Sequence, residues 1–113
     1  MTTSGPAKVA FLILSDDPAR ALPGLVMAAR MKVNRGAEVR VLFFGPGVRL
    51  LASGAADEQL AALGEAAIRP LACSANVEQY GLTKEVGERP VGLVAAGAEV
   101  EEFALLGFTV LSF

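Results

Sequence analysis

The feature that most constrains the fold is a series of short apolar segments, each separated from the next by a stretch with helical periodicity. The first, "KVAFLILS" (Lys8–Ser15), is a nearly continuous apolar run followed by two acids, as is typical of a strand buried on both faces. Strands that alternate with helices form a parallel sheet covered on both sides. We therefore predict a single α/β domain over residues 1–113, a flavodoxin-like three-layer sandwich preceded by a flexible lead-in at residues 1–7. Its five-stranded parallel sheet is expected to use segments near residues 8–14, 38–44, 68–73, 91–96 and 108–112.

Helices are expected between these strands. Pro23 is predicted to open the longest helix in its first turn, and Gly36 to end it. Pro70 is awkward in a central strand because it removes a hydrogen bond from the ladder. The third strand is therefore either as short as Leu71–Cys73 or less central than its place in the chain indicates. The carboxyl ends of the first, third and fourth strands are expected to line a shared cleft. Further helices are expected over residues 57–67, 74–80 and 98–107.

Composition favours self-association and excludes several classes of partner. Hydrophobic residues make up 53% of the chain and charged residues only 19%, so a lone monomer would leave apolar surface exposed. We therefore expect a homo-oligomer. The net charge of −2 and the lack of a basic block argue against nucleic acid as a partner. No run approaches the roughly 18 apolar residues of a membrane helix, so we expect no membrane partner and a cytoplasmic location.

The sequence offers almost no ligands for a metal ion. It contains no histidine and one cysteine, Cys73, so neither a zinc site nor an internal disulfide is expected. Asp16 and Asp17 follow the first strand and are interpreted as caps of the next turn rather than as a metal-binding pair. No cofactor is expected.

Cys73 is the candidate catalytic residue. It is expected at the carboxyl end of the third strand, the edge where ligands of open α/β sheets collect, and at the start of a helix. Backbone N–H groups there, those of Ser74 and Ala75, favour a thiolate, and Asn76 and Tyr80 lie one helical turn apart on the same helix. We therefore expect a partly accessible thiol. The alternative is a small buried apolar side chain, which is common for a free cysteine.

The lack of histidine and of a second cysteine limits the reactions in which Cys73 can take part. Without histidine it cannot form the Cys-His pair of a hydrolase, and without a second cysteine it cannot resolve an internal disulfide. A lone activated thiol can instead carry a group: a persulfide, an acyl group or a mixed disulfide with another protein.

Several segments together resemble the DsrE/DsrF-like family of small sulfur-relay proteins. They are "NRGAEVRVLFFGPGVRLL", "IRPLACSANVEQYGLTKEV" and the terminal "GFTVLSF", and the resemblance covers Lys8 to Phe113. It implies a flavodoxin-like fold and assembly into trimers or hexamers. It also implies that a cysteine in the position of Cys73 accepts sulfur as a persulfide. Only Cys73 is carried over from the family.

Two functions follow. The first is a sulfur-carrier or sulfurtransferase-like protein that holds a persulfide on Cys73 and works with a sulfur donor or acceptor protein. The second is a non-catalytic oligomeric α/β module that binds a small ligand or a protein partner, with Cys73 structural. Whether the protein is an enzyme stays open between them.

Overall fold

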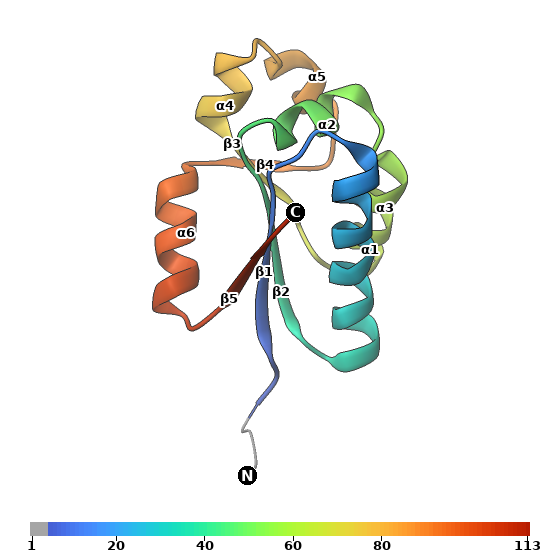
Figure 1. The fold of residues 1–113 in the computed structure, drawn as a ribbon, viewed down its shortest axis with the longest axis vertical. Helices are drawn as coiled ribbons and strands as arrows, with labels where there is room; N and C mark the ends of the chain where they lie inside the picture. Colours follow the sequence, from blue (N-terminus) through green and yellow to red (C-terminus); the bar gives the residue numbers. More distant parts are fainter. Residues whose placement is uncertain (1–4) are drawn as a thin grey trace.

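The structure, a computed structural model, describes residues 5–113 and contains one parallel sheet in that range (Figure 1). Residues 1–4 of the expected lead-in lie outside the described residues. All neighbouring strands run parallel, in the order β4-β3-β2-β1-β5, which confirms the five-stranded parallel sheet of an α/β sandwich. The strands are β1 (Lys8–Ile13), β2 (Glu38–Phe43), β3 (Leu71–Cys73), β4 (Gly92–Val94) and β5 (Thr109–Ser112).

Helices cover the two faces of the sheet unequally (Figure 1). Those that follow β1 and β2 lie on one face, α6 lies on the opposite face, and α4 and α5 sit above the carboxyl ends of the strands. The connections from β1 through β4 step in one direction across the sheet, whereas the connection through α6 returns to its other edge. Right-handed crossovers therefore require opposite faces. The helices are α1 (Pro18–Arg35), α2 (Gly47–Ser53), α3 (Asp57–Glu65), α4 (Ser74–Gln79), α5 (Thr83–Gly87) and α6 (Ala96–Leu105).

Two hydrophobic clusters fill the space between these layers, because neighbouring strand residues point to opposite faces. Phe11 of β1 belongs to the cluster on the α1 side, which also contains the buried residues of α2, α3, α4 and α5. Ala10, one residue earlier, belongs to a smaller cluster on the α6 side. We call these the major cluster and the minor cluster. The minor cluster contains six buried residues: Ala10, Leu42, Cys73, Ala96, Phe103 and Phe108.

The longest helix starts earlier than the sequence predicts. It begins at Pro18, with Asp17 as its N-cap, and the Asp17 Oδ1 accepts a hydrogen bond of 3.0 Å from the Ala19 N–H. Asp17 and Pro18 together supply a cap and a first residue that needs no hydrogen-bond partner for its nitrogen. Pro23 therefore lies inside the helix, and the prediction that it opens the helix is wrong. Gly36 ends the helix as predicted, with a left-handed φ of 67°.

The third and fourth strands are shorter than predicted. β3 comprises only Leu71–Cys73, the shorter of the two alternatives for a strand that follows Pro70. Pro70 still accepts a hydrogen bond at its carbonyl oxygen from the Gly92 N–H, at 2.9 Å. β4 ends at Val94 because α6 begins two residues later. The short helices α2 and α5 were not predicted from the sequence.

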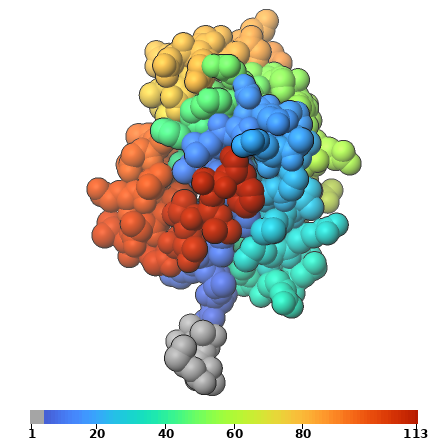
Figure 2. All heavy atoms as spheres, viewed as in Figure 1, coloured from blue at the N-terminus to red at the C-terminus, as the bar shows by residue number. Residues whose placement is uncertain are grey.

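β5 forms one edge of the sheet and remains largely exposed. All four of its residues are exposed, and in Figure 2 the C-terminal atoms lie at the surface between those of α6 and α1. The strand is fixed at its end by Phe113, whose ring stacks on Phe11 with centroids 5.7 Å apart. The Phe113 carbonyl oxygen also accepts hydrogen bonds from the Leu14 and Ser15 N–H groups. Among the described helices, none is long and apolar enough to cross a membrane.

Candidate functional site

Cys73 lies at the end of β3, next to the end of β4, and a different helix follows each of these strands. It is the last residue of β3 and the N-cap of α4, and its pairing partner across the sheet is Val94, the last residue of β4. After β3 the chain enters α4, above the carboxyl ends of the strands, whereas after β4 it enters α6, which covers one face of the sheet (Figure 1). Such a divergence between neighbouring strands is the place where open α/β sheets bind ligands. The predicted position of Cys73 at the carboxyl edge is therefore correct.

The sulfur of Cys73 is buried on the α6 side of the sheet. The residue is 4% exposed and belongs to the minor cluster with Ala96 and Phe103 of α6. The preceding residue, Ala72, belongs to the major cluster, so the alternation along β3 directs Cys73 beneath α6. The expectation of a partly accessible thiol is wrong for the folded chain, because the residue is buried in the minor cluster beneath α6.

Ser74 ties the ends of the two strands together. Its hydroxyl donates a hydrogen bond of 3.2 Å to the carbonyl oxygen of Val94. Ala75 follows it in the first turn of α4 and is exposed. Ser74 therefore holds β3 and β4 at a fixed separation beside the thiol.

The Asn76 side chain contacts the end of β2 and not the strand ends beside Cys73. Its Oδ1 accepts a hydrogen bond of 2.8 Å from the Gly45 N–H, in the turn between β2 and α2, and its Nδ2 donates one of 3.2 Å to the Gln79 Oε1. Both hydrogen-bonding groups of the amide are thus engaged within the protein. The side chain fixes α4 against the end of β2.

Tyr80 lines a hollow between α2 and α5. The hollow has a volume of about 430 Å³ and is lined by Arg49, Ala52, Ser53, Tyr80, Leu82 and Glu85. The Arg49 guanidinium lies over the Tyr80 ring, 4.3 Å from its centroid, and also forms a 3.6 Å ion pair with Asp16. Asp16 is thus a partner of Arg49 rather than a cap, which corrects its interpretation from the sequence. Arg49 itself was not predicted, and its contacts join segments with no local pattern in common.

The structure separates the residues that the sequence grouped at one site. Cys73 belongs to the minor cluster, whereas Tyr80 packs against the major cluster. In addition, β2 lies between β1 and β3, so the ends of the first, third and fourth strands do not meet in one cleft. Ser74 contacts the strand ends beside Cys73, and Asn76 and Tyr80 serve the packing of α4 against α2. No group of three or more potential metal ligands occurs within residues 5–113.

Several solved structures share this fold, and two of them are of proteins described as having unknown function. The conserved protein BT1422 from Bacteroides thetaiotaomicron is 21% identical over 94% of each chain, with a TM-score of 0.80. MTH1491 from Methanobacterium thermoautotrophicum is 20% identical over 95% of this chain and 99% of that chain, with a TM-score of 0.75. The ychN protein from E. coli is 14% identical over 94% of this chain and 99% of that chain, with a TM-score of 0.72.

These similarities extend over nearly the whole chain, but at such low identities they establish the fold alone. The sequence matches no protein-family model and no curated protein.

Proposed function

We propose that the protein carries sulfur as a persulfide on Cys73, as the resemblance to the DsrE/DsrF-like family implies. The observation that supports this most is the position of the thiol, at the neighbouring ends of β3 and β4, from which the chain enters two separate helices, α4 and α6. The backbone N–H groups of Ser74 and Ala75 begin the helix that follows and are the groups nearest in sequence to stabilise a sulfur anion.

The transfer needs no external oxidant. The Cys73 thiolate attacks the outer sulfur of a donor persulfide, a new S–S bond forms on Cys73, and the S–S bond of the donor breaks. The donor leaves as a thiolate with the electron pair of the broken bond, and the reverse step passes the sulfur to an acceptor thiol. A sulfur donor or acceptor protein with its own reactive thiol is therefore the partner, and a reducing compartment such as the cytoplasm suits the free thiol.

Burial of Cys73 makes this transfer depend on an opening of α6. Cys73 is 4% exposed, so a donor cannot reach its sulfur while the minor cluster, which includes Ala96 and Phe103 of α6, stays packed around it. The N-cap of α6 is Ala95, which provides no side-chain hydrogen bond to the first turn. A helix start without such a cap is less stable by about 1 kcal/mol than one capped by serine, threonine, aspartate or asparagine. The proposed route to the sulfur is a transient opening of that turn.

We also propose that the protein acts as a homo-oligomer, a trimer or a hexamer. Support comes from its low share of charged residues and from its exposed apolar side chains, among them Leu93, Leu105 and Met27. Light scattering gives the test, and a stable monomer at micromolar concentration would contradict self-association.

The burial of Cys73 favours a second function, a non-catalytic module in which the cysteine only fills space. In this alternative the hollow beside Tyr80 and Arg49, or an exposed apolar surface, contacts a small ligand or a protein partner. The thiol then behaves as an ordinary core residue.

Incubation with glutathione persulfide, followed by the mass of the intact protein, distinguishes the two functions. A carrier gains one sulfur atom in the native state, and the gain is lost on reduction. Cys73→Ala is the matched control, because it removes the thiol without placing a hydroxyl in an apolar environment. If the native protein gains no sulfur while the unfolded chain does, the thiol is structural.

A further inference from the structure

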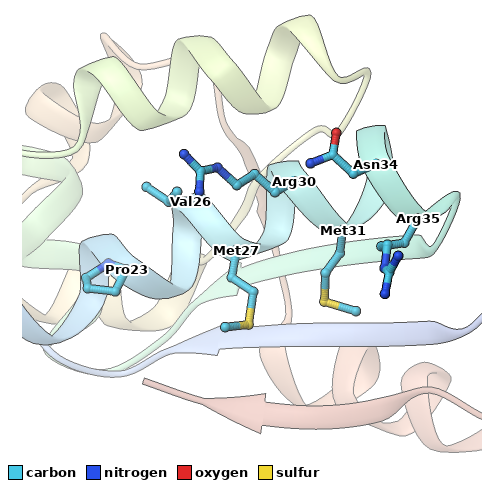
Figure 3. A pocket seen from close by; sticks show the side chains of 7 residues that line it. All are labelled: Pro23, Val26, Met27, Arg30, Met31, Asn34 and Arg35. Atoms are coloured by element: carbon cyan, nitrogen blue, oxygen red, sulfur yellow. The ribbon is translucent and has the colours of Figure 1, made fainter.

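A hollow along α1 combines apolar and basic side chains (Figure 3). Its volume is about 370 Å³, and Val26 and Met27 beside it are 38% and 47% exposed. In Figure 3, Met27 and Met31 extend from α1 on the side of the strands, whereas Arg30 and Asn34 lie farther from them. Flexible methionine side chains adapt to the shape of a docked group. The hollow is lined by Pro23, Val26, Met27, Arg30, Met31, Asn34 and Arg35.

The charge of α1 has a single sign. The helix contains four basic residues, Arg20, Arg30, Lys32 and Arg35, and no acid. Arg30 and Arg35, which line the hollow, form no ion pair with any residue of the described range 5–113. The hollow therefore presents two uncompensated positive charges next to an apolar floor, and this combination suits a partner with an acid beside an apolar side chain.

α6 presents that combination on its outer side. The helix contains Glu99, Glu101 and Glu102 and no basic residue. Phe103 is fully buried and marks the inner side, so Glu101 and Leu105, each two residues away, lie about 200° around the helix on the outer side. Leu105 is 78% exposed, the highest value among the exposed large apolar residues of the described chain. Glu101 precedes it by four residues, so the two side chains are neighbours on one face.

We propose that the outer side of α6 docks into the α1 hollow of a second copy of this chain. Leu105 then occupies the apolar part of the hollow beside Met27, while Glu101 and Glu102 approach Arg30 and Arg35. The spacing of the apolar and charged side chains is similar on the two helices. About one helical turn separates Leu105 from Glu101 on α6, and about one turn separates Met27 from Arg30 on α1. Two α6 surfaces, both acidic, repel each other, as do two basic α1 surfaces. The charges therefore select α6 against α1.

The resulting assembly is head-to-tail. α1 and α6 lie on opposite faces of the sheet, so each copy contacts one neighbour through α6 and another through α1 (Figure 1). Such an interface produces a closed ring or an open chain of copies rather than a dimer with one shared patch. This inference rests on the proposed self-association and is independent of the sulfur chemistry of Cys73.

Charge reversal tests the pairing by the mass of the assembly in light scattering at low salt. The double variant Glu101→Lys/Glu102→Lys and the double variant Arg30→Glu/Arg35→Glu should each weaken association, by roughly tenfold or more in Kd. An equal mixture of the two should associate again, because each reversed surface then finds a complementary one on the other variant. Glu58→Lys/Glu78→Lys, on exposed positions of α3 and α4, makes the same charge change as the first variant and should leave the wild-type mass unchanged.

Three results would overturn the proposal. If the wild-type protein is a monomer, both the self-association and the interface fail. If it associates but either double variant retains the wild-type mass, only the α6–α1 interface fails. If both variants dissociate and their mixture does not recover, α6 does not pair with α1 through these charges, and the proposed interface fails. Circular dichroism confirms that each variant is folded, and Leu105→Asn, which keeps all charges, should weaken association as well.

Discussion

The two faces of the sheet differ in how much protein covers them. On the α1 side, twenty buried residues form the major cluster, with contributions from five helices. On the α6 side, six buried residues form the minor cluster beneath a single helix of the described chain. Cys73 belongs to the smaller one. Because buried apolar area supplies most of the stability of a domain, the major cluster holds the fold together. The minor cluster is the thinner layer, and it is the one that buries the thiol.

The largest loss of stability is expected from a truncation in the major cluster. Phe11→Ala removes a fully buried ring that stacks on Phe113, and should lower the free energy of unfolding by about 3–5 kcal/mol. Urea denaturation followed by circular dichroism measures it. A cost below that of the corresponding change in the minor cluster would reverse the comparison between the faces.

The corresponding change is Phe103→Ala in α6. Phe103 is also fully buried, but the minor cluster has fewer buried residues and can collapse more easily around the missing ring. We therefore expect the free energy of unfolding to fall by about 3 kcal/mol. The rate at which iodoacetamide modifies Cys73 in the native protein should rise, because the cover over the sulfur is loosened. Val33→Ala, at an exposed position of α1, is the control and should change neither quantity.

A smaller effect is expected at the contact between α4 and the end of β2. Asn76→Ala leaves the partly buried Gly45 N–H without its acceptor and should cost about 1–2 kcal/mol. The measurement is again urea denaturation, with Glu78→Ala as an exposed comparison on the same helix. Equal costs for the two variants would show that the hydrogen bond to Gly45 adds nothing.

The smallest expected effect is a gain in the stability of the protein. Gly97→Ala in the first turn of α6 has room for the added methyl group, and should stabilise the protein by up to about 1 kcal/mol. It should also slow the labelling of Cys73, since a stiffer first turn opens less often. Gly87→Ala in α5 has equal room and serves as the matched control. If Gly87→Ala slows the labelling of Cys73 as much as Gly97→Ala does, the route to the thiol does not pass through α6.

The sequence predicted β1 and β2 well because the signal of these strands is local. The apolar runs around β1 and β2 are long and bounded by polar or breaking residues, and the ends of these strands were predicted to within one residue. The position of Cys73 at the end of a strand followed in the same way. The strand order could not be predicted, because the rule for right-handed crossovers permits several arrangements of five parallel strands.

The surroundings of the thiol were harder to predict for a physical reason. Leu71, Ala72 and Cys73 are all apolar, so alternation along β3 gives no sign of which residue lies beneath α6. The ion pair of Arg49 with Asp16, and its contact with Tyr80, join three segments of the chain through tertiary structure alone. The helices α2 and α5 span only seven and five residues, lengths at which packing rather than propensity decides.

The strand order also has a consequence for chain entropy. β1 pairs with β2 between residues 30 positions apart, as in Lys8 with Glu38, but with β5 between residues 100 positions apart, as in Val9 with Thr109. Closing the longer loop costs about 1 kcal/mol more in chain entropy. The α6 side has fewer buried residues whose packing could offset that cost. We therefore expect α6 and β5 to dock last during folding and to detach first from the native state. Amide hydrogen exchange should accordingly be faster in β5 than in β2.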